Sequence, residues 1–461
     1  MRGGIFSVVL LACCLPGRTL LADDADMIPD AVLAPTQDAP PERGTDRSLS
    51  AKAFVEAATQ DIGWRATTPP VPGLDTSRYQ GWTSFDLNAK YRVSDTVSLA
   101  LSDRLDQSYE DSHTPTTNMA RNSLREAYAD WTPDEGWFFD LGRVNTRDGV
   151  AQAFNPTDFL KTQAVVLRQN LDPDALRTNR LGTVMARAQT VSDAGSITVL
   201  AAPRLTFSHG PLENQVFLAD FDRTNADWRF LAKASLHTQT ALVPEILAYT
   251  EGHGSPRFGV NLSQGIGDRI VVWNEWSGGR QANLVQSAIT YAVSNGILPQ
   301  GSPTPIAVDP TQTFQTQNAM GASLSFESKL TLSLEWHYNQ RGLTASQWRD
   351  WFKTGRSFPA LAAALWEVRA YAQAMGEPMG RNEVYGRADW TDFPIRDMTT
   401  SAFALLDPTD GSLFGQVSAE YFLSPKVTTG LRATLAPGSG SSQWGTLPEA
   451  WALLGHVVVY F

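Results

Sequence analysis

The chain has 461 residues, of which 42% are apolar, a formal net charge of -11 and a slightly negative mean hydropathy. After the first residues there is no run of about 18 or more apolar residues, which excludes a protein that crosses a membrane as helices. The acidic balance provides no basic surface for nucleic acid, so a nucleic-acid-binding protein is excluded as well.

Residues 1–22 have the pattern of a secretory signal peptide. A basic start and an apolar stretch from Ile5 to Cys14 precede a cleavage site after Ala22. A Leu-Leu-Ala-Cys motif that ends at Cys13 also resembles a lipoprotein cleavage site, and acylation of Cys13 stays open as an alternative. The only two cysteines lie in this segment, so we expect no disulfide in the exported chain.

The next segment, residues 23–59, is predicted to be a periplasmic arm. From Asp23 to about Ser50 it is acidic and rich in proline, and it has few large apolar groups to bury. One folded domain is then expected over residues 60–461.

Within this domain, segments of strand length alternate between apolar and polar residues. Apolar residues from Leu330 to Tyr338, for example, alternate with polar residues from Thr331 to Asn339. This is the period of a β-strand with one apolar and one polar face. The predicted strands lie near 60–67, 80–93, 97–106, 122–131, 137–144, 182–190, 196–203, 227–237, 244–251, 257–264, 269–276, 318–326, 330–338, 382–391, 398–406, 414–422, 427–436 and 449–461. The first is weak, and sixteen strands would follow if one hairpin is misread.

The lengths of the connections distinguish a barrel from a soluble β-sandwich, which also shows alternation. Tight connections such as 94–96 and 327–329 alternate with long ones such as 145–181 and 339–381. Outer-membrane barrels have short periplasmic turns and long extracellular loops. We therefore predict an all-β fold: a transmembrane, antiparallel, up-and-down β-barrel of 16–18 strands over residues 60–461.

The long loops carry helical signals. Asn155-Pro156-Thr157-Asp158 combines a capping residue, a proline and an acid in the first turn. Thr344-Ala-Ser-Gln347 matches a capping box, and the apolar stretch from Leu361 to Met375 predicts a second helix in the same loop.

The last strand has apolar or small residues at alternate positions from Trp451 to Phe461. It resembles the C-terminal signal of Gram-negative outer-membrane β-barrels. The resemblance implies a place in the cell outer membrane, and contact with outer-membrane lipid and with the barrel-assembly machinery.

Three motifs, Leu124-Arg-Glu-Ala-Tyr128, Asn155-Pro-Thr-Asp-Phe159 and Glu335-Trp-His-Tyr-Asn339, resemble those of a group of uncharacterised proteobacterial outer-membrane barrel proteins. The resemblance covers most of residues 80–461 and implies fold and location, but no substrate.

A barrel of 16–18 strands is too wide for side chains to fill, so its lumen is expected to hold water. The alternation places charged residues of both signs on the inner face, and this mixture argues against strong ion selectivity. The alternative is that they only solvate the wall and pair with one another. The predicted pore-lining residues are Lys90, Arg92, Arg104, Arg125, Arg187, Arg229, Lys233, Glu335, His337, Arg387 and Arg432.

The long segment 145–181 is the best candidate for a pore constriction. Its apolar residues are too many to leave in water, so we expect it to fold back into the lumen, as the constriction loop of porins does. An extracellular lid over the barrel mouth is the alternative. The predicted constriction residues are Arg143, Arg147, Asp148, Asp158, Lys161 and Arg168.

The sequence thus predicts a porin-like channel for passive passage of small hydrophilic solutes. An exporter or a structural subunit of an envelope assembly, with the arm docking a periplasmic partner, is the second hypothesis. The histidines are scattered, so we expect no metal, no cofactor, no catalytic residue and no enzyme activity. The solute, the charge selectivity and the choice between monomer and trimer stay open.

Overall fold

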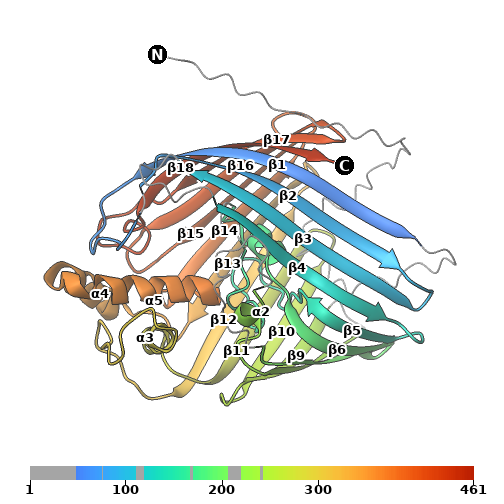
Figure 1. The fold of residues 1–461 in the computed structure, drawn as a ribbon, viewed down its shortest axis with the longest axis horizontal. Coiled ribbons are helices and arrows are strands. Elements are labelled where there is room, and N and C mark those ends of the chain that lie inside the picture. Colours follow the sequence, from blue (N-terminus) through green and yellow to red (C-terminus); the bar gives the residue numbers. More distant parts are fainter. Residues whose placement is uncertain (1–47, 75, 111–118, 167–169, 206–219, 239–241) are drawn as a thin grey trace.

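The computed structural model describes residues 48–461, except 75, 111–118, 167–169, 206–219 and 239–241. Eighteen strands form one antiparallel sheet in which each strand pairs with its neighbours in the chain. The first strand also pairs with the last, from Phe54 opposite Tyr460 to Trp64 opposite Glu449, which closes the sheet into a barrel (Figure 1). The strands are β1 Leu49–Trp64, β2 Tyr79–Arg92, β3 Val97–Glu110, β4 Met119–Trp131, β5 Trp137–Val144, β6 Thr183–Ser192, β7 Gly195–Ala202, β8 Arg229–Leu236, β9 Leu242–Glu251, β10 Arg257–Ile266, β11 Ile270–Gln281, β12 Thr313–Ser325, β13 Leu330–Asn339, β14 Asn382–Thr391, β15 Met398–Leu406, β16 Leu413–Ser424, β17 Val427–Leu435 and β18 Glu449–Tyr460.

All eighteen predicted strands are present, but the predicted start of the barrel is wrong. Strand β1 begins at Leu49 rather than near residue 60, and it pairs with β2 from Leu49 opposite Tyr91 to Asp61 opposite Tyr79. Residues 49–59 are therefore wall and not arm. Four of them are alanines, whose small side chains hide the alternation between faces. The predicted signal peptide and residues 23–47 of the predicted arm lie outside the described residues.

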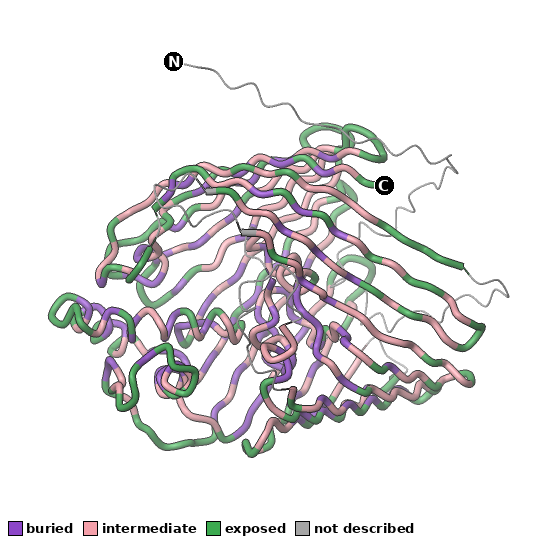
Figure 2. Tube along the Cα trace, in the orientation of Figure 1, coloured by how far each residue is buried: buried purple, intermediate pink, exposed green. Residues whose placement is uncertain are grey.

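The two faces of the wall differ as the alternation predicts. Along β13, Leu334 is 61% exposed on the outside, whereas the adjacent Glu335 is 1% exposed on the inside. Figure 2 shows the same change of colour along many strands. Apolar side chains stand outward around the barrel and polar ones inward, which is the arrangement of a barrel that crosses a membrane. Among the described helices, none is long and apolar enough to span a bilayer.

Three helices lie together at one end of the barrel, opposite the tight turns (Figure 1). They are α3 (Leu284–Ser294), in the loop between β11 and β12, and α4 (Ala345–Ser357) and α5 (Ala362–Met375), between β13 and β14. Their buried apolar side chains form one cluster, which we call the lid. The predicted capping box at Thr344 and Gln347 and the predicted second helix are confirmed, whereas α3 was not predicted.

The helix predicted after Asn155 is wrong. Residues 155–162 form turns, and the helix of this loop is α1 (Pro173–Thr178), which Asp172 caps through the backbone N–H of Asp174. The local capping signal at Asn155 is overridden because backbone N–H groups of residues 150–157 donate to carboxylates of the barrel wall.

The first prediction compares two adjacent residues of β2. Leu87 is on the outer face, and Asn88 faces a cavity in the lumen. A charge on the lipid face costs roughly 2 to 4 kcal/mol near the bilayer midplane, so Leu87→Arg should lower the yield of folded barrel. Asn88→Arg should assemble like the wild type. The folded fraction is measured by heat-modifiable migration on SDS gels, and equal yields would contradict the assignment of the faces.

Candidate functional site: the pore and its inner loop

The loop between β5 and β6, residues 145–182, lies inside the barrel, and we call it the inner loop. Phe159 and Leu160 are 2% and 3% exposed, and they pack with inward side chains of the wall such as Leu231 and Leu247. The ring of Phe159 stacks on that of Tyr249, with 4.8 Å between ring centroids. The prediction that this loop folds into the lumen is confirmed, and the alternative of an external lid is wrong.

Two wall carboxylates anchor the backbone of the inner loop. Glu275 of β11 accepts hydrogen bonds from the backbone N–H groups of Val150 at 2.9 Å, Ala151 at 3.0 Å and Thr157 at 2.7 Å. It also accepts one from the Thr157 hydroxyl at 2.8 Å. Because a buried carboxylate is unfavourable without such partners, and loop N–H groups need acceptors away from water, the contact satisfies both sides.

Glu335 of β13, two strands from Glu275 of β11, also accepts hydrogen bonds from the loop backbone. It accepts hydrogen bonds from the backbone N–H of Gln152 and from that of Ala153, the latter at 3.0 Å. His337 lies between this carboxylate and Glu383, at 2.9 Å and 3.0 Å from their oxygens. Hydrogen bonds to ionised groups are about twice as strong as neutral ones, so the two carboxylates fix the centre of the loop.

Ion pairs tie the rest of the inner loop to the same side of the barrel. Asp148 pairs with Lys233 of β8 at 2.7 Å, and Asp172 pairs with Arg387 of β14 at 2.6 Å. Arg229 of β8 lies 3.3 Å from the Thr162 hydroxyl and pairs with Glu251 at 2.8 Å.

The predicted pore-lining residues therefore divide into groups. Each lines a cavity of the lumen, contacts the inner loop or its anchors, or pairs along the inner wall. Five lie under the inner loop, where they hold it or its anchors and do not border an open passage, because the loop covers their part of the wall; these are Arg229, Lys233, Glu335, His337 and Arg387. Arg187 pairs with Asp140 at 2.5 Å along the wall.

The opposite part of the lumen holds a cavity of about 410 Å³ between the inner loop and the wall, which we call the passage cavity. Arg104, Arg125 and Arg432 line it from the wall, and Arg147 lines it from the loop. Asp86 lies 2.6 Å from Arg125, and Asp106 lies 2.9 Å from Arg104.

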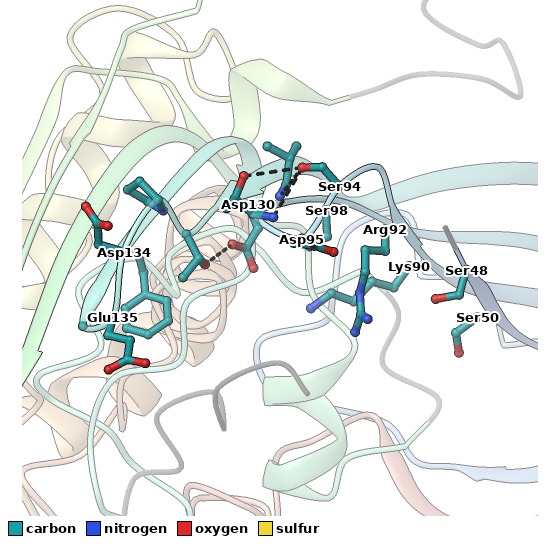
Figure 3. Close-up of a pocket in the computed structure, with 16 residues that line it drawn as sticks. Ser48, Ser50, Lys90, Arg92, Ser94, Asp95, Ser98, Asp130, Asp134 and Glu135 are labelled. Atoms are coloured by element: carbon teal, nitrogen blue, oxygen red, sulfur yellow. Dashed lines mark hydrogen bonds between the residues drawn. The ribbon is translucent and has the colours of Figure 1, made fainter. Parts of the chain in front are cut away.

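A second and larger cavity, of about 1160 Å³, lies at the end of the barrel that carries the tight turns. Figure 3 shows Lys90 and Arg92 of β2 close together in this turn-side vestibule. Carboxylates also line it, among them Asp95, Asp134 and Glu135 of the turns.

Of the six predicted constriction residues, Arg147 alone is placed beside the passage cavity. Arg143 is 1% exposed and donates to the backbone oxygen of Gly182 at 2.9 Å, so it holds the start of β6 and meets no solute. Asp148 and Asp158 are buried in ion pairs, the latter with Arg180 at 2.8 Å. Lys161 faces the lid and not the passage cavity. Arg168 lies outside the described residues.

The second prediction tests the anchor at Glu275. A glutamine there offers one acceptor oxygen where the carboxylate offers two, and its amide N–H₂ meets the donors of the loop. Because each hydrogen bond to a charged group contributes about 1.5 to 3 kcal/mol, Glu275→Gln should raise hydrogen exchange of residues 150–157 at least tenfold. Glu327→Gln, in an exposed turn, is the matched control. Unchanged exchange in a folded Glu275→Gln barrel would show that the carboxylate does not anchor the loop.

No protein-family model matches the chain, and no curated protein matches it. Solved structures do match over most of their length. Pseudomonas aeruginosa OccK5 (OpdH) is 9% identical with a TM-score of 0.48, covering 90% of this chain and 98% of that one. A variant of OccD1 (OprD) is 6% identical with a TM-score of 0.48, covering 92% and 97%. A variant of the Rh. blastica porin is 11% identical with a TM-score of 0.39, covering 90% and 100%.

The architecture of the chain itself decides its class. The sheet of eighteen antiparallel strands is closed, its outer face is apolar, its inner face is charged, and a long loop folds into its lumen. The chain is a closed, antiparallel, up-and-down β-barrel with the architecture of the outer-membrane type.

Proposed function

We propose that the chain is an outer-membrane channel through which small hydrophilic solutes pass passively. The observation that carries this proposal is the position of the inner loop. It is anchored against β8 to β14, and it leaves the passage cavity beside β1 to β4 and β17. A loop that narrows a wet lumen without filling it sets a size limit for solutes while it keeps a polar route.

The charges around the passage cavity support a weakly selective route. Four arginines and three carboxylates line it, and the arginines of the wall lie within 4 Å of acids, Arg432 at 3.9 Å from Glu420. Because charges of opposite sign offset one another, the field along the route is mixed. Arg147 is exposed on the loop side of the cavity, and it adds positive charge where the water layer is thin.

The third prediction concerns conductance. Purified wild-type protein in planar bilayers should give stable ohmic conductance, and deletion of residues 150–170 should raise the single-channel value because it removes the body that narrows the lumen. Glu327→Gln serves as the folded control with wild-type conductance. A folded wild-type barrel without conductance would contradict the channel function. A folded deletion variant with unchanged conductance would contradict the role of the inner loop as its constriction.

The fourth prediction concerns ion selectivity. A unit charge about 4 Å from a passing ion contributes about 1 kcal/mol in water, which is roughly a fivefold change in partitioning. Arg147→Glu changes the local charge by two, and the two factors multiply, so it should raise the partitioning of cations by up to roughly 25-fold and shift the permeability ratio toward cations. Lys353→Glu on the exposed face of α4 makes the same charge change away from the passage cavity and should leave the ratio unchanged. Equal permeability ratios in both variants would show that Arg147 does not lie beside the path of the ions.

A further inference from the structure

A third cavity, of about 240 Å³, lies between the inner loop, α5 and the loop that joins β17 to β18, and we call it the lid chamber. One part of its lining is apolar and comes from Phe154, Leu171, Leu176, Met379, Leu405 and Trp444. The other part is charged, with side chains from the inner loop, from α5 and from β14. The chamber thus has an apolar and a polar part, as small-molecule sites do.

The carboxylates that line the lid chamber already have side-chain partners. Asp158 pairs with Arg180 at 2.8 Å, and Glu377 pairs with Arg341 at 2.5 Å. Glu383 lies 3.0 Å from the ring of His337. None of these acids therefore forms an ion pair with the other three cations of the chamber, Arg177, Arg369 and Lys161.

Three cations of the chamber have no carboxylate partner in the described part of the chain. Arg177 donates to the backbone oxygens of Ala151 and Asp148, each at 3.2 Å. Arg369 of α5 donates to the backbone oxygen of Gln443 at 2.8 Å, and Lys161 donates to that of Asn155 at 2.7 Å. Neutral carbonyls orient these groups but do not neutralise their charge, and taking a charge out of water without an ion-pair partner is unfavourable.

Unsatisfied donors point to the same conclusion. Within the described residues, the Nε atoms of Arg177 and Arg369 and the indole nitrogen of Trp444 are buried without a hydrogen-bond partner. Arg369 is itself only 6% exposed. A buried donor without an acceptor is destabilising, so an acceptor-rich group in this place would be stabilised.

Burial also lowers the pKa of Lys161 to about 8 and the pKa of Arg369 to about 10. Both groups are positively charged at neutral pH, and in both cases desolvation outweighs the nearby acids. The nearby acids are Asp158, Glu377 and Glu275 for Lys161 and Asp410 for Arg369, and they offset the cost of burial only in part.

We propose that the lid chamber binds a small organic anion, with its acidic group toward Arg177, Arg369 and Lys161 and its apolar part against the apolar lining. At about 30 Å³ for each water-sized atom, the chamber has room for about eight non-hydrogen atoms. A carboxylate with a short hydrocarbon chain has this size and shape. The proposal goes beyond the channel function and does not depend on it, because binding is measured without a membrane.

The test uses the full chain in detergent at pH 6.5, where Lys161 is protonated, with hexanoate as the probe. We expect saturable heat in calorimetry and a change in tryptophan fluorescence, because Trp444 lines the chamber. Hexan-1-ol, which lacks the charge, and inorganic phosphate, which lacks the apolar chain, should each bind at least tenfold more weakly. Phosphate binding as tight as hexanoate would show an anion site without the apolar part and would overturn the proposal.

Three variants remove one cation each: Arg177→Gln, Arg369→Gln and Lys161→Met. Each should weaken hexanoate at least tenfold, whereas Lys353→Gln, on the exposed face of the neighbouring helix α4, should bind like the wild type. Folding of every variant is checked by heat-modifiable migration, and Lys161→Met preserves the shape of the side chain if an arginine variant misfolds. The proposal would be overturned if the wild type did not bind hexanoate. It would also be overturned if folded Arg177→Gln and Lys161→Met bound hexanoate as tightly as the wild type does.

Discussion

Every backbone N–H and C=O group of a wall surrounded by lipid needs a partner within the protein, and the rest of the structure depends on this requirement. Pairing of β1 with β18 satisfies it by removing both edges of the sheet. Closure then fixes which residues face inward, because the side chains of a strand alternate between faces. A closed barrel of eighteen strands leaves a lumen that its own wall cannot fill, and the inner loop lies in this space.

The same requirement explains how a loop without regular structure is held in a lumen. Its N–H groups have no neighbouring strand, so carboxylates of the wall take the place of backbone acceptors. Glu275 receives three backbone donors and Glu335 receives two. Since these acids and their supporting residues lie on one side of the barrel, the loop fills that side and leaves the other open. Residues at inward-facing positions of their strands thus have different roles. Arg387 binds the loop, whereas Arg432 faces the passage cavity.

The wall could be predicted from the sequence because a period of two is a local signal. The prediction from this period failed at β1, where small residues such as Ala51 and Ala57 give no contrast between faces. It also missed α3, which Asn283 caps through the N–H of Gln286 inside a segment read as a long loop. The contacts of the site are not local: Thr157 and Glu275 are 118 residues apart, and no pattern along the chain records that pair. The sequence does carry one signal of the lid chamber. Arg369 is a cation on the apolar, buried face of α5, four residues after Leu365.

The inner loop is fixed from both sides, by the wall and by the lid. On its wall side the carboxylates hold residues 150–157. On its lid side the N–H of Gln163 donates to the backbone oxygen of Ala374 at 2.7 Å, near the end of α5. That helix ends at Gly376 in the left-handed conformation, with φ of 63°, and a Cβ there would lie 3.3 Å from Lys161. A glycine thus ends the helix without strain and leaves room for the lysine. Because residues 150–157 are bonded to the wall and Gln163 is bonded to α5, the inner loop is held between the barrel wall and the lid.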